Sequence, residues 1–80
     1  MNIFFSKTSL KYLSKLEKQV RMNIIQAIEG LPDEGDICKM RGRSIQNIYR
    51  LRVSKYRVLY IQEEDTIKIL DIDTRGDIYK

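Results

Sequence analysis

The spacing of apolar residues divides the chain into a helical first half and a β-structured second half. Apolar residues recur at steps of three and four, which is the period of one buried helical stripe. They are Leu10, Leu13, Leu16, Val20, Ile24, Ile28 and Leu31. A single helix of this length would extend beyond so small a domain. We therefore expect two antiparallel helices, with the break near Leu16 to Lys18.

Residues that start and stop helices lie on both sides of this stripe. The short run Asn2 to Phe5 is apolar and β-prone. Ser6 or Thr8 can then cap the helical region, because a hydroxyl accepts a hydrogen bond from an amide of the first turn. Gly30 and the turn-forming residues from Pro32 to Asp36 end the helix and predict a loop.

In the second half, apolar and basic residues alternate from Tyr49 to Val53, as in a strand with one buried face. Ser54-Lys55 predicts a tight turn into a strand from Tyr56 to Gln62. A second turn at Glu63 to Thr66 leads to a strand from Ile67 to Ile72. We expect the helices to cover one face of this antiparallel meander, which is an α+β fold in a single domain over residues 1–80.

Positive charge is concentrated in one segment. Between residues 39 and 57 there are seven basic residues and no acidic ones, whereas the whole chain has a formal charge of +4. The seven are Lys39, Arg41, Arg43, Arg50, Arg52, Lys55 and Arg57. We expect their mutual repulsion to be uncompensated, which favours a polyanionic ligand such as RNA or DNA phosphate. The alternative is a solvated basic surface without a ligand.

Strand geometry brings three of these arginines together. Arg50 and Arg52 should leave the same side of the sheet, about 6–7 Å apart and away from the helices. Arg57 follows the turn and should lie across from Arg52 or diagonal to it. Tyr49 and Tyr56, beside Arg50 and Arg57, are expected to complete a rigid surface for the polyanion.

The composition excludes several kinds of chemistry. The chain has no histidine and one cysteine, so it can form no histidine-based triad, no zinc site and no intramolecular disulfide. We expect no metal and no cofactor, and we expect Cys38 to be a small buried residue. No apolar run approaches the roughly 20 residues that span a membrane. With no signal-like stretch near Met1, this predicts a cytoplasmic protein.

The chain resembles the RelE/ParE superfamily, the toxin half of bacterial type II toxin–antitoxin modules, and it is closer to the RelE branch. The segments that carry the resemblance are Phe5-Ser6-Lys7, Lys39-Met40-Arg41-Gly42, Tyr49 to Val53, Tyr56 to Tyr60 and Asp73 to Tyr79. The resemblance implies a microbial-ribonuclease-like fold, in which two N-terminal helices pack on a four-stranded, mainly antiparallel sheet.

The resemblance also implies a function and a set of site residues. RelE-like members cut mRNA in the ribosomal A site without a metal and so inhibit translation. By this resemblance Arg57 stabilises the scissile phosphate, Arg75 is the second active-site arginine and Tyr79 is the C-terminal tyrosine. Arg50 and Arg52 occupy positions where that branch often has RNA-contacting lysines. The RNA-binding set is then Lys39, Arg41, Arg43, Arg50, Arg52 and Lys55.

Two other functions stay open. ParE-like members inhibit DNA gyrase and are not nucleases, and a third possibility is a catalytically weak module that binds nucleic acid. Arg52 cannot act as a general base, as a lysine there could. The implied partners are a cognate antitoxin, the ribosome with its mRNA, and operator DNA contacted indirectly through the antitoxin. No membrane partner is expected.

Overall fold

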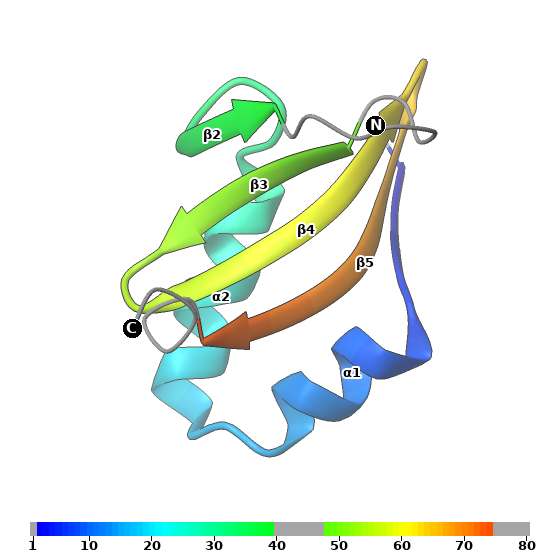
Figure 1. The fold of residues 1–80 in the computed structure, drawn as a ribbon. Helices are drawn as coiled ribbons and strands as arrows, with labels where there is room; N and C mark the ends of the chain where they lie inside the picture. The colour runs from blue at the N-terminus through cyan, green and yellow to red at the C-terminus, as the bar shows by residue number, and fades with distance from the viewer. Residues whose placement is uncertain (1, 40–47, 75–80) are drawn as a thin grey trace.

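The computed structural model describes residues 2–39 and 48–74, and in these ranges two helices lie on one side of a five-stranded sheet (Figure 1). The predicted α+β class is confirmed. The elements in chain order are β1 (Asn2–Phe5), α1 (Lys7–Ser14), α2 (Lys18–Glu29), β2 (Asp36–Lys39), β3 (Ile48–Val53), β4 (Tyr56–Glu63) and β5 (Thr66–Thr74).

The sheet has the strand order β1-β5-β4-β3-β2. β1 runs parallel to β5, and the other neighbouring strands are antiparallel. The expected number of four strands is too small by one, because β2 begins at Asp36, where the sequence predicts a loop. This edge strand gives a weak signal, since Ile37 is partly buried while its other three residues are exposed. Gly35, with φ of +119°, leads into it.

The predicted break between the helices is confirmed, since α1 ends at Ser14 and α2 begins at Lys18. Figure 1 shows the two helices set at a wide angle, not side by side as the antiparallel pair that we expected. Gly30 caps the end of α2, as the sequence predicts. Within the described ranges, both helices fall short of the length and apolar character needed to cross a membrane.

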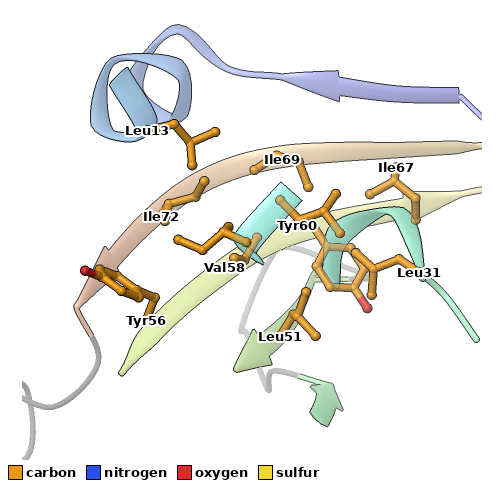
Figure 2. Packing of buried hydrophobic residues seen from close by; sticks show 11 residues of the cluster. Leu13, Leu31, Leu51, Tyr56, Val58, Tyr60, Ile67, Ile69 and Ile72 are labelled. Carbon is orange, nitrogen blue, oxygen red and sulfur yellow. The ribbon is translucent and has the colours of Figure 1, made fainter. Parts of the chain in front are cut away.

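The core lies between the helices and the covered side of the sheet. Leu51, Val58 and Ile72 form one cross-strand row over β3, β4 and β5, and each is at most 1% exposed. Figure 2 shows this row together with Leu13 of α1, which points toward the same cluster. Burying each such side chain contributes roughly 1.5–3 kcal/mol. Alternate residues of these strands are thereby fixed on the covered side.

Tyr60 is a polar side chain within this core. It is fully buried, and its ring stacks on Tyr49 with a centroid distance of 5.5 Å. Its hydroxyl has no hydrogen-bond partner among the described residues. Burial, with a smaller contribution from Tyr49, raises the pKa of Tyr60 to about 12 from its ordinary value of 10.

We expect the Tyr60→Phe variant to resist high pH better than the wild type. The folded protein holds the Tyr60 proton more tightly than the unfolded chain does, so this contribution to stability is complete below pH 10 and is lost as the pH rises toward about 12. The wild type should lose roughly 2 kcal/mol more than the variant over this range. Urea unfolding at several pH values measures it. A parallel decline in both proteins would contradict the prediction.

Candidate functional site

Three arginines share the side of the sheet that faces away from the helices. Leu51 and Val58 point into the core, so by strand alternation the residues beside them, Arg52 and Arg57, point outward. Arg52 and Arg57 are directly opposite each other in the β3–β4 register, which is one of the two positions expected, and Arg50 lies two residues before Arg52 on the same side. We call this surface the open face; its described polar residues include Asp36, Arg50, Arg52, Arg57 and Asp73.

Arg57 is held by a bidentate ion pair with Asp73, its cross-strand neighbour on β5. Its Nε donates to Oδ1 of Asp73 at 3.1 Å, and its Nη2 donates to Oδ2 at 2.9 Å. The Arg57 side chain is 15% exposed and that of Asp73 is 36% exposed. Two parallel charge-assisted hydrogen bonds at a largely buried guanidinium fix its orientation.

Arg52 has a much looser acidic neighbour. Asp36 of β2 is its register partner, but the distance from Nη1 of Arg52 to Oδ2 of Asp36 is 4.0 Å. The side chains are 37% and 65% exposed, so solvent screens this pair strongly. Across four strands the order is therefore Asp36, Arg52, Arg57, Asp73. The expectation of uncompensated repulsion is wrong, because acids from flanking strands lie beside the two arginines.

The open face also has hydrogen-bond donors without acceptors. The Nε atoms of Arg50 and Arg52 are buried, and neither has a hydrogen-bond partner among the described residues. An unsatisfied buried donor is costly, and a guanidinium can only donate. An acceptor with several oxygens, such as a phosphodiester, would satisfy such donors.

Tyr49 and Tyr56 do not take part in this surface. Tyr49 stacks on Tyr60 within the helix-covered side, and Tyr56 contacts Tyr12 of α1 edge-on at 6.4 Å between ring centroids. The expected surface of alternating arginine and tyrosine is wrong, since neighbours along a strand point to opposite sides.

Two further predicted site residues that the structure describes, Lys39 and Lys55, are not gathered with the arginines. Lys39 is exposed and pairs with Tyr49, which places it on the helix side of β2. The Nζ of Lys55 lies 5.6 Å from the centroid of the Tyr56 ring. Arg41, Arg43, Arg75 and Tyr79 lie outside the described residues.

Cys38 is exposed, contrary to expectation. It lies on the edge strand β2, opposite Arg50 on the open face, where no helix covers it. In the described ranges, no group of three or more acidic or cysteine side chains is placed to hold a metal ion.

The partner of Arg57 depends on an irregularity in β5. Tyr60 pairs with Ile69, whereas Leu59 pairs with Asp71, so Leu70 is an extra residue in the strand. Without it, Arg57 would face Ile72 instead of Asp73. Sequence reasoning missed Asp73 for this reason, because a register counted from the turn gives the wrong residue.

Ser6 holds this bulge. Its Oγ donates to the carbonyl oxygen of Leu70 at 2.8 Å and accepts from the amide of Ser9 at 3.1 Å. The backbone amide of Ser6 also donates to the Ile69 carbonyl oxygen at 2.9 Å. The residue that caps α1, one of the two that the sequence analysis names, thus also fixes β5 at the bulge.

Comparison with protein-family models matches residues 3–79 to the ParE toxin of type II toxin–antitoxin systems, parDE. The chain therefore belongs to this toxin family, within the RelE/ParE superfamily. A comparison with curated proteins gives no match.

Solved structures of RelE-like proteins share the fold. A chain of the RelB–RelE antitoxin–toxin complex from Methanococcus jannaschii is 32% identical, with a TM-score of 0.75 over 95% of this chain and 94% of that one. A chain of the RelE–RelB complex from Pyrococcus horikoshii is 25% identical, with a TM-score of 0.74 over 94% of this chain and 94% of that one. The isolated RelE toxin from E. coli, at 22% identity, TM-score 0.66 and coverage of 98% and 89%, shows the likeness of fold alone.

We expect Ser6→Ala to lower the free energy of unfolding by about 1–2 kcal/mol, because it removes a helix cap and a hydrogen bond to the bulge. Thr8→Ala is the matched control, since Thr8 is the other candidate cap and is exposed. The control should change stability by less than about 0.5 kcal/mol. Urea unfolding measures both, and equal losses would show that Ser6 has no special role.

Proposed function

We propose that this toxin inhibits translation by cutting mRNA on the ribosome, in the cytoplasm and without a metal. The observation that supports this most is the gathering of Arg50, Arg52 and Arg57 on one uncovered side of the sheet. Such a surface suits a phosphodiester backbone, and the likeness to RelE structures favours an endoribonuclease.

The reaction that we propose is a transfer within the RNA. The 2′-hydroxyl attacks the neighbouring phosphorus in line and the bond to the 5′-oxygen breaks. The 5′-oxygen takes a proton from water and leaves as a hydroxyl, and a 2′,3′-cyclic phosphate remains on the other fragment. Arg57 and Arg75 stabilise the negative charge that develops on the phosphate oxygens. A well-placed donor of this kind contributes about 3–4 kcal/mol. The role of Arg75 is carried over from the family resemblance.

The proton of the 2′-hydroxyl needs an acceptor. Arg50, Arg52 and Arg57 keep their own protons and cannot accept another. We therefore assign this step to the phenolate of Tyr79, a role carried over from the family resemblance. Alignment of the nucleotide by the ribosome supplies much of the remaining rate increase.

Inhibition of DNA gyrase without nuclease activity is the second candidate function. Two observations favour it: the matching family model is that of the ParE toxin, and Arg57 is already paired with Asp73. A gyrase inhibitor would need no phosphate-stabilising arginine.

Arg57→Ala should abolish growth arrest and reduce mRNA cleavage about 10²–10³-fold, because the transition-state charge loses a donor. Induced expression followed by mapping of mRNA 5′ ends measures this. Lys68→Ala is the control, since it also removes one positive charge from the sheet, from an exposed lysine on β5 that pairs with Glu63. It should cleave within about threefold of the wild type.

Two outcomes would overturn this assignment. One is cleavage by Arg57→Ala at the wild-type rate, and the other is DNA breakage with intact mRNA, which indicates gyrase as the target. The double variant Arg57→Ala/Asp73→Ala removes both members of the pair, so that an unpaired Asp73 carboxylate cannot cause the loss through misfolding.

We also propose a cognate antitoxin that neutralises the toxin, with acidic side chains reaching Arg50, Arg52 or Arg57, and that carries the pair to operator DNA. The solved relatives described as antitoxin–toxin complexes support it. Co-expression with the product of the neighbouring reading frame should restore growth and give a complex that co-purifies. Charge reversal by Arg50→Glu should weaken that complex at least tenfold. An unchanged affinity would exclude this face from the contact.

A further inference from the structure

Asp73 occupies the edge of Arg57 that a phosphate would use. The Nε and Nη2 atoms of Arg57 both donate to its carboxylate. We propose that Asp73 is an internal substitute for an RNA phosphate, which holds Arg57 until a phosphodiester of bound RNA displaces it. The inference rests on the proposed function, since it treats RNA as the ligand of the open face.

A phosphodiester can replace the Asp73 carboxylate because a guanidinium binds both anions in the same geometry. Both anions present two oxygens to two parallel N–H groups. The guanidinium of Arg57, which is 15% exposed, would lose two charge-assisted hydrogen bonds if Asp73 simply moved away. Exchange of one anion for the other avoids this cost, so Asp73 leaves only as the phosphate arrives.

The position of Asp73 permits the exchange. Its side chain is 36% exposed, and it is the second-last residue of β5. A partly solvated carboxylate near a strand end can turn toward water at low cost. Arg57 lies on β4, the middle strand of the sheet, with β3 on one side and β5 on the other, and its backbone remains in place.

Neighbouring groups would hold the incoming backbone. The Nε atoms of Arg50 and Arg52 lack acceptors among the described residues. RNA with consecutive phosphates can satisfy these donors and displace Asp73 in one event. An isolated phosphate meets a row in which Asp36 and Asp73 offset the charges of Arg52 and Arg57, so it binds weakly. Because of Asp73, tight binding of RNA therefore requires several phosphate contacts at the same time.

The test compares Asp73→Asn with Asp71→Asn, which changes the net charge equally on the same strand. The Asp71 carboxylate accepts from the amide of Ile72 at 2.9 Å, a bond that asparagine can keep. The probes are inorganic phosphate and a 2′-O-methyl RNA oligonucleotide, whose blocked hydroxyl prevents cleavage. Fluorescence anisotropy at several salt concentrations gives the RNA affinity, and thermal unfolding with and without phosphate reports on that anion and on folding.

We expect Asp73→Asn to bind the RNA roughly fivefold more tightly than the wild type, because the RNA no longer has to break the partly exposed Arg57–Asp73 ion pair. The slope of log affinity against log salt should stay nearly the same, because RNA contacts Arg57 in both proteins once it has displaced Asp73. Asp71→Asn removes the same charge from the same face of β5 but leaves the Arg57–Asp73 pair in place, so it should raise the affinity less than about twofold.

Affinity of Asp73→Asn equal to or below that of Asp71→Asn would overturn the inference, because Asp73 would then only position Arg57. A gain for inorganic phosphate without a gain for RNA would overturn the assignment to an RNA phosphate. Tighter RNA binding by Asp73→Asn, together with no cleavage by the wild type, would support the exchange at Arg57 while refuting the nuclease function.

Discussion

The extra residue in β5 determines both what this protein buries and what it exposes. With Leu70 inserted, Ile72 joins the core row and Asp73 reaches the open face opposite Arg57. Without it, the end of β5 would present Ile72 to solvent and Asp73 to the core, because side chains alternate along a strand. The hydrogen bond from Ser6 to the Leu70 carbonyl oxygen connects this bulge to the N-terminal cap of α1. A local defect in one strand is therefore stabilised by the first helix.

The core and the candidate site belong to adjacent rows of one ladder. Leu51, Val58 and Ile72 form the buried row, and Arg52, Arg57 and Asp73 form the next row on the opposite side. Any slip of β3 or β5 would bury charges and expose the core, so hydrophobic burial holds the arginines in register. The site needs no separate scaffold, since the packing that stabilises the fold also positions its guanidinium groups.

Local patterns in the sequence predict much of this structure. The period of the apolar stripe, the helix stops and the alternation from Tyr49 give the two helices and the three-stranded meander. The tight turn at Ser54-Lys55 predicts that Arg57 lies across from Arg52 or diagonal to it. What the sequence does not reveal depends on contacts between distant segments. The short edge strand β2 is stabilised by pairing with β3. The pairing of Arg57 with Asp73 depends on a bulge in β5 that no turn residue in the sequence indicates. The orientation of Tyr49 could have been predicted, because period-two alternation already separates it from Arg50.

The case for an anionic ligand changes when these contacts are considered. Arginines directly opposite each other on adjacent strands destabilise a sheet. Here Asp36 and Asp73 flank the pair, so the protein can fold with both arginines in place and no ligand bound. Clustered charge in the sequence is therefore weak evidence for a polyanion. The stronger evidence is the structural placement of Arg50, Arg52 and Arg57 on one uncovered side of the sheet, together with Nε donors of Arg50 and Arg52 that have no acceptor among the described residues.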